Sequence, residues 1–177
     1  MKYSFMSFST PELTLGEMLA LAKRLGYDAI EPRIVAKHKH GIECETDAAT
    51  RRAIREQVAA SGVPLCCIAT SCTYADPAKV KQMVDDTRRC IDLAADLGAP
   101  RLRVFGGGIP KTIAREQAIE GVADALRSVA DQAQERGVTL CMETHDDWCN
   151  PDHVAAVMKR VNHPAIAVNW DIMHPIN

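Results

Sequence analysis

Short apolar runs alternate with longer amphipathic stretches along the whole chain. Every apolar run except the first follows a residue that favours the left-handed conformation at a helix end, namely Gly26, Gly62, Gly98, Gly137 or Asn162. The apolar runs predict six short buried strands, at about residues 2–8, 28–33, 64–69, 101–105, 138–143 and 166–171. Their starts recur at the spacing of one strand–helix unit, so the sequence predicts a repeated βα pattern.

Five helices are expected between these strands. Turns that contain proline mark three of the helix starts, at Thr10-Pro11-Glu12, Asp76-Pro77 and Asn150-Pro151-Asp152. Residues of these types cap helix N-termini. In residues 78–97 and 119–133, apolar side chains recur at helical spacing and form one face. Such faces are typical of helices that cover a sheet.

The repetition of βα units determines the expected fold class. The sequence has no Gly-x-Gly-x-x-Gly after its first strand and no Walker motif, which argues against nucleotide-binding doubly wound folds. Uniform βα repetition favours a parallel (β/α) TIM barrel. A complete barrel typically needs about 250 residues, whereas this chain has 177. We therefore expect one domain, residues 1–177, that forms an incomplete α/β barrel of six strands and five helices.

Two carboxylates and an imidazole follow the last two predicted strands. Glu143 ends the fifth strand, Asp171 ends the sixth, and His174 follows shortly after. Because parallel strands gather functional residues at their carboxyl ends, we expect these three side chains at one mouth of the sheet, with His145 nearby. Such ligands suit Mn²⁺, Mg²⁺, Co²⁺ or Zn²⁺. The alternatives are that Glu143 pairs with an interior Arg, Asp171 caps a helix and His174 has no ligand role.

Weaker candidates lie at the other strand ends. Arg33 ends the second strand, and His38 and His40 follow in its loop. His40 or His38 either contacts a substrate or belongs to a loop that is simply solvated. By strand alternation His145 should point into the barrel towards a substrate, whereas Trp170 should face the helices and pack against them. Gly106-Gly107-Gly108 either lets the backbone approach a ligand or makes a turn.

The composition is that of an ordinary globular protein, with 47% apolar residues, 25% charged residues and a net charge of −2. It gives no reason to expect nucleic acid or a membrane as a partner, and no apolar run approaches the roughly 20 residues of a membrane span. A cytoplasmic protein is the default expectation. The seven cysteines form no Cys-x-x-Cys pair, so we interpret them as reduced core thiols, with Cys72 and Cys149 as weak candidates for a nucleophile.

The stretches Met142-Glu143-Thr144-His145 and Asn169-Trp170-Asp171-Ile172-Met173-His174 resemble the xylose isomerase-like TIM-barrel superfamily. The likeness extends over essentially the whole chain. That superfamily contains sugar and sugar-phosphate isomerases and epimerases, inosose dehydratases and endonuclease IV. The resemblance implies that Glu143 and Asp171 bind a divalent metal and that His174 contacts substrate. In the family, a His after strand seven and a Glu on strand eight complete the site, and this sequence contains neither strand.

The resemblance implies a metal-dependent sugar or sugar-phosphate isomerase or epimerase, with Glu143 as the catalytic residue that moves a proton through an enediolate. Mn²⁺ is the preferred ion, Glu143 and Asp171 are its ligands, and a homo-oligomer is one option for the assembly. The candidate substrate-binding residues are His174, His145, Arg33 and His40. An endonuclease IV-like nuclease is one alternative, although residues 103–111 contain no His and the chain is slightly acidic. A non-catalytic binding domain is the other.

Two further expectations concern the barrel interior and its edges. Glu31 and Arg103 should both point into the barrel and form an ion pair, because a lone buried charge is costly. The first and sixth strands should lack partners on their outer sides, which should leave Glu143 and Asp171 unusually exposed. We expect either further residues of the native protein or a second chain to fill this opening.

Overall fold

The computed structural model describes residues 1–174. Within them, parallel strands alternate with α-helices in the predicted order. The strands are β1 (Ser4–Met6), β2 (Ala29–Glu31), β3 (Ile68–Ala69), β4 (Arg101–Phe105), β5 (Thr139–Glu143) and β6 (Ile166–Asn169). The helices are α1 (Leu15–Leu25), α2 (Ala48–Ser61), α3 (Val80–Leu97), α4 (Arg115–Glu135) and α5 (Pro151–Val161), and short 3₁₀ segments span Ser7–Ser9 and Asp146–Trp148.

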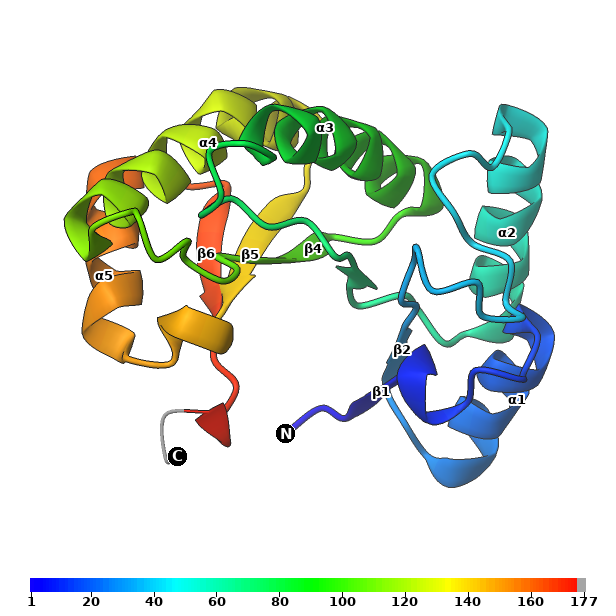
Figure 1. Cartoon of the computed structure of the whole chain (residues 1–177). Coiled ribbons are helices and arrows are strands. Elements are labelled where there is room, and N and C mark those ends of the chain that lie inside the picture. Colours follow the sequence, from blue (N-terminus) through cyan, green and yellow to red (C-terminus); the bar gives the residue numbers. More distant parts are fainter. Residues whose placement is uncertain (175–177) are drawn as a thin grey trace.

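The strands pair in sequence order, and every pairing is parallel. β1 pairs with β2, and β3, β4, β5 and β6 pair in turn. Between β2 and β3 the pairing is not continuous and consists of two isolated bridges, Ile30 to Leu65 and Arg33 to Ala69. Both strands are shorter than predicted because regular pairing is interrupted there. Figure 1 shows the helices on the outside, in an arc that is open between the N-terminus and β6. This arrangement confirms the α/β class and the incomplete (β/α) TIM barrel.

The two strands at the ends of this order are the edges of the sheet. Within the described residues, β1 pairs only with β2 and β6 pairs only with β5, as predicted. Each therefore presents unpaired backbone groups on its outer side.

The helix starts differ from prediction in two of three cases. α1 begins after Thr14, whose hydroxyl accepts the N–H of Glu17 while the Glu17 carboxylate accepts the N–H of Thr14, so this capping box and not Thr10 sets the start. Asp76 closes a turn ahead of α3 and does not cap the helix itself. Asn150 caps α5 as predicted. Across residues 1–174 no helix combines the length and hydropathy that a membrane span needs.

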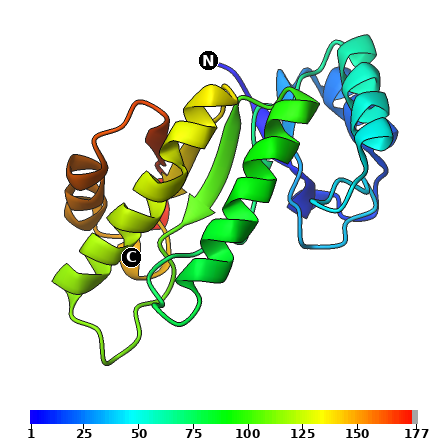
Figure 2. The same cartoon turned by 90° about the horizontal axis from the view of Figure 1, so that it is seen from above.

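Alternate residues of β4 and β5 serve two different faces of the sheet. Leu102, Val104, Leu140 and Met142 are fully buried on the side of the helices. Figures 1 and 2 show α3 and α4 side by side over these two strands. The intervening side chains point to the inside of the arc. The apolar core therefore lies between sheet and helices, and it holds the polar inner face in place.

Trp170 does not pack as predicted. Its side chain is 68% exposed, and Val168 on the same side of the chain is 43% exposed. Within the described residues no α-helix follows β6, so this side of the strand is covered at Ile166 but not at its carboxyl end. The prediction that Trp170 packs against helices is therefore wrong for this structure.

Candidate active site at the carboxyl ends of the strands

A cleft of about 580 Å³ lies where the carboxyl ends of the strands meet. Its walls come from the last residues of β1, β4 and β5 and from the segments that follow β1, β2, β3, β5 and β6. It is lined by Met6, Phe8, Arg33, Ser71, Thr73, Arg103, Phe105, Glu143, His145, Asp146, Asp171 and His174. The structure thus brings together five of the six candidate residues that the sequence indicated, and the expected grouping of Glu143, Asp171 and His174 at one mouth is confirmed.

Glu143 is held in place by two neighbours. Asn169, its partner in the ladder between β5 and β6, donates a hydrogen bond of 2.7 Å from Nδ2 to Oε2 of Glu143. The Nε atom of Arg103 lies 3.5 Å from the same oxygen. The Glu143 side chain is only 12% exposed, so the expectation of unusual exposure is wrong for this residue. Asp171, with 32% of its side chain exposed, is more open.

Arg103 pairs with Glu143, and the predicted ion pair between Glu31 and Arg103 is not formed. Both side chains point inwards as expected, and they line one small interior cavity. The strand register explains the different partner. Ala69 is level with both Arg33 and Arg103, so Glu31 lies two residues below Arg103. Burial raises the pKa of Glu31, while the nearby charge of Arg103 lowers it, so the two groups interact without direct contact.

Asp171 is fixed by the buried residue that directly follows β5. Its N–H donates to the hydroxyl of Thr144 at 2.9 Å, and Thr144 is 2% exposed. One carboxylate oxygen, Oδ1, accepts the N–H of Met173 at 2.8 Å, so Asp171 caps a turn. The other, Oδ2, lies 3.5 Å from Nε2 of His174. Asp171 thus caps a turn rather than the helix that the alternative interpretation expected, and its second oxygen faces His174.

Three rings form one wall of the cleft. The ring of His145 lies 4.3 Å from that of His174 and 4.9 Å from that of Phe105, measured between centroids. Nδ1 of His145 is 2.8 Å from a carboxylate oxygen of Asp146. Sequence reasoning missed Phe105 and Phe8 as lining residues. For Phe105 the signal was present, because it has the same strand parity as Arg103 and follows it by one alternation.

The structure does not bring His40 to the cleft. The side chain is buried, its Nδ1 accepts the N–H of Ile42 at 3.0 Å, and its Nε2 therefore donates to the carbonyl oxygen of Arg33 at 3.1 Å. Burial lowers the pKa of His40, which favours the neutral ring. With both nitrogens bonded to backbone, His40 orders the loop that carries Arg33, and the geometry gives no support to a contact with substrate.

The triple glycine after β4 serves packing. A Cβ atom on Gly106 would overlap the indole of Trp148, and one on Gly107 would lie 2.6 Å from Cβ of Thr73. Gly107 also has φ of +83°, which disfavours other residues. Trp148 is completely buried, and its Nε1 donates to the carbonyl oxygen of Gly107 at 2.8 Å. The loop is therefore shaped by Trp148, which supports the turn interpretation.

The family follows from a direct match. The family model described as xylose isomerase-like TIM barrel matches residues 19–177. This chain belongs to the xylose isomerase-like TIM barrel family. None of the curated proteins compared with it matches.

Solved structures of the xylose isomerase-like fold agree. The IOLI protein with a bound zinc atom has a TM-score of 0.81 and 17% identity, over 98% of this chain and 64% of that one. D-psicose 3-epimerase in the presence of D-fructose has a TM-score of 0.79 and 19% identity, over 98% of this chain and 64% of that one. A xylose isomerase-like TIM barrel protein from Mycobacterium smegmatis, in complex with magnesium, has a TM-score of 0.73 and 18% identity, over 99% of this chain and 66% of that one. The chain thus spans 64 to 66% of the length of these proteins.

A divalent ion is what the xylose isomerase-like resemblance implies, and the donor types in the cleft suit one. Glu143, Asp171 and His174 offer carboxylate oxygens and an imidazole nitrogen on one cleft. In this structure the Glu143 carboxylate contacts Asn169, and the Asp171 carboxylate contacts the N–H of Met173 and the ring of His174. Within residues 1–174, no three His, Cys, Asp or Glu side chains converge as a ready set of ligands. The described residues therefore supply candidate ligands but not a complete coordination shell.

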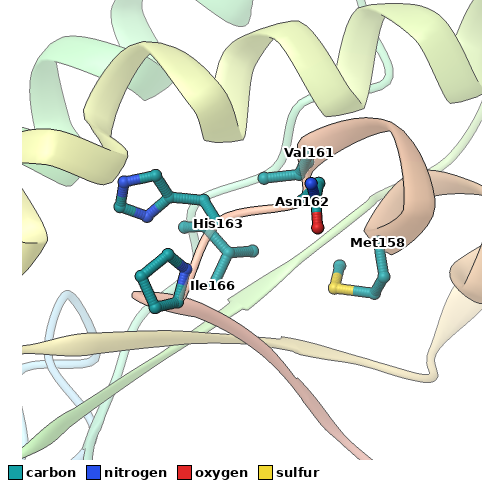
Figure 3. Close-up of a pocket in the computed structure, with 6 residues that line it drawn as sticks. Met158, Val161, Asn162, His163 and Ile166 are labelled. Atoms are coloured by element: carbon teal, nitrogen blue, oxygen red, sulfur yellow. The ribbon is translucent and has the colours of Figure 1, made fainter.

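A second cavity, of about 450 Å³, lies at the opposite end of β6 (Figure 3). It is lined by Met158, Val161, Asn162, His163, Pro164 and Ile166. Nδ1 of His163 accepts the N–H of Ala165, and its Nε2 lies 3.3 Å from Asp131. With its one histidine already engaged, this cavity is a weaker candidate than the cleft. All seven cysteines are free thiols, and none lines the cleft.

Proposed function

We propose that this protein is a metal-dependent isomerase or epimerase that acts on a sugar or a sugar phosphate. The observation that carries the proposal is the cleft that Glu143, Asp171 and His174 share at the carboxyl ends of β5 and β6. Membership of the xylose isomerase-like family and the fold shared with D-psicose 3-epimerase support it. The zinc and magnesium in two of the compared structures support a divalent ion, for which we propose Mn²⁺.

Glu143 moves the proton in this proposal. Its carboxylate takes a proton from the carbon next to the substrate carbonyl and produces an enediolate. Epimerisation requires a second acid that protonates the opposite face of that carbon, the position that the strand-eight Glu would supply by the family resemblance, whereas transfer of the proton by Glu143 to the neighbouring carbon gives an isomer. The hydrogen bond from Asn169 fixes the orientation of the carboxylate. The guanidinium of Arg103, next to the same oxygen, places positive charge where negative charge develops.

The other cleft residues bind and orient the substrate. A divalent ion held by Glu143 and Asp171 would polarise the carbonyl and hydroxyl oxygens of the sugar. His174 and His145 present ring nitrogens at the same wall and donate hydrogen bonds to substrate hydroxyl groups. The ring of Phe105 closes this wall and keeps water away from the reacting carbons.

The test is the exchange of solvent deuterium into D-fructose, D-psicose and fructose 6-phosphate in the presence of Mn²⁺. Glu143→Gln should slow the exchange by roughly 10²- to 10⁴-fold, the usual contribution of a general acid–base group. Asp171→Asn should weaken Mn²⁺ binding, followed by electron paramagnetic resonance without sugar, by at least about tenfold.

Glu120→Gln on α4 is the matched control, because this exposed glutamate lies outside the cleft. It should leave both measurements unchanged. Exchange that Glu143→Gln does not slow, or Mn²⁺ binding that is insensitive to Asp171→Asn, would count against the proposal.

A further inference from the structure

The two halves of the cleft carry opposite charges. Among the residues that line it, the segments from β1 to β4 contribute the cations Arg33 and Arg103 and no carboxylate. The carboxylates Glu143, Asp146 and Asp171 all come from β5, β6 and the segments that follow them. A molecule bound in the cleft therefore meets cations on one side and acids on the other.

The acids have partners, but Arg33 has none. Glu143 and Asp171 accept hydrogen bonds from Asn169 and from the N–H of Met173, and Oδ1 of Asp146 lies 2.8 Å from Nδ1 of His145. The guanidinium group of Arg33, in contrast, makes no hydrogen bond or ion pair with the residues that the structure describes, and its Nε is buried. Its recorded contact is with the ring of Phe8, whose centroid lies 5.6 Å from Cζ. A guanidinium group has five N–H donors, which normally have acceptors, so Arg33 is available to bind an anion.

Arg103 is deeply buried, and its positive charge is only partly balanced by neighbouring groups. It is 3% exposed, and within residues 1–174 its Nε and Nη1 make no hydrogen bond. Glu143 is its ionic neighbour at 3.5 Å, and the ring of Phe105 lies 4.1 Å from Cζ. Arg33 and Arg103 line the same cleft and are level in the sheet, because Ala69 pairs with both of them. Their like charges repel each other at this wall, and an anion bound there would relieve the repulsion.

We propose that the substrate carries an anionic group, a phosphate or a carboxylate, which binds at the wall formed by Arg33 and Arg103 while the reacting carbons lie at Glu143. This inference rests on the proposed function, because that function places the reaction at Glu143. Guanidinium groups match the geometry of phosphate and carboxylate oxygens. Phe8 and Phe105 lie against the two guanidinium groups, and within the described residues Nε of Arg33 and Nη1 of Arg103 have no hydrogen-bond acceptor, so these N–H groups remain for the anion. Neutral ketoses are then the weaker ligands.

The test compares fructose 6-phosphate, gluconate and fructose by calorimetric titration of the full chain in Mn²⁺. At least one of the anions should bind about tenfold or more tightly than fructose, because its hydrogen bonds to Arg33 are charge-assisted. Arg33→Gln should remove most of this preference, because it should weaken the preferred anion about tenfold more than it weakens fructose. Arg101→Gln is the control, because Arg101 is on the same strand as Arg103 but is exposed and outside the cleft.

The outcomes separate the two anions and the two proposals. A preference for fructose 6-phosphate alone identifies a phosphate group, and one for gluconate alone identifies a carboxylate. Equal affinity for all three compounds, or a preference that Arg33→Gln leaves intact, overturns the inference. Deuterium exchange tests the proposed function separately. An Arg33-dependent preference without exchange leaves an anion site and removes the isomerase, whereas Glu143-dependent exchange on fructose without the preference does the reverse. Arg33→Gln decides the matter even if substitution of buried Arg103 prevents folding.

Discussion

Replacement of Arg103 by Met tests the reading of the barrel interior most directly. Arg103 and Glu143 are 4% and 12% exposed in their side chains, so their interaction is only weakly screened by water. Met has a similar length and no charge, so Arg103→Met removes the cation with little change in volume. The variant leaves Glu31 and Glu143 on the inner face without the positive charge between them. Glu143→Gln is the reciprocal variant, in which Arg103 keeps the neighbouring charge of Glu31.

The separation of the two groups sets the expected magnitude. At 3.5 Å, Coulomb's law with an effective dielectric constant of about 20 gives roughly 5 kcal/mol. Desolvation offsets part of this, and the loss of one partner of a buried pair typically costs about 3–5 kcal/mol. Because the Arg103–Glu143 contact is longer than a hydrogen bond, we expect Arg103→Met to lower the free energy of unfolding by about 3 kcal/mol at pH 7. Glu143→Gln should lower it by about half as much, since Arg103 retains Glu31.

The loss should also depend on pH. Burial already raises the pKa of Glu31 in the folded protein, and Arg103 opposes that rise. Without Arg103 the folded-state pKa of Glu31 rises further above its unfolded value. In the window between these two values the folded state binds the extra proton, so stability falls as pH increases and recovers as pH decreases. The defect of Arg103→Met should therefore be smaller at pH 5 than at pH 7.

Urea unfolding followed by circular dichroism at both pH values measures these effects, provided that the m-value is unchanged. Arg101→Met is the control, because Arg101 is exposed on the same strand. Its unfolding free energy should change by less than about 0.5 kcal/mol. A loss below about 1 kcal/mol for Arg103→Met, equal losses for the two reciprocal variants, or a defect that does not shrink at pH 5 would refute the reasoning.

Two further predictions concern stability. Gly106→Ala should lower the unfolding free energy by about 1–3 kcal/mol, because the added Cβ overlaps the buried ring of Trp148. Gly121 lies in α4 with open space around it, so Gly121→Ala should instead raise the unfolding free energy by up to about 1 kcal/mol. Similar effects of the two alanines in urea unfolding would contradict the packing account. Thr14→Ala should lower the unfolding free energy by about 1 kcal/mol, because it removes the capping box of α1, whereas Thr10→Ala should lower it by less. The reverse order would indicate that Thr10 is the cap.

The sequence determined the elements and the place where the chemistry gathers. Strand and helix limits follow from local patterns, so Asn150 could be recognised as the cap of α5 from its neighbours alone. The start of α1 was predicted wrongly at Thr10, but the sequence contains the correct signal, because Thr14 and Glu17 have the spacing of a capping box. Since parallel strands end at one edge of their sheet, Glu143 and Asp171 had to lie close together once both strand ends were known.

Only the tertiary structure decided which groups touch. Arg103 had to point inwards by alternation, but its choice of Glu143 over Glu31 depends on the register between β2, β3 and β4, which no single strand encodes. His40 became a backbone support for Arg33 because its loop folds into the interior. Trp170 stayed exposed because packing requires a neighbour, and the described chain has none there. Local propensities act over a few residues, whereas register, burial and partners are set by the whole assembly of the sheet.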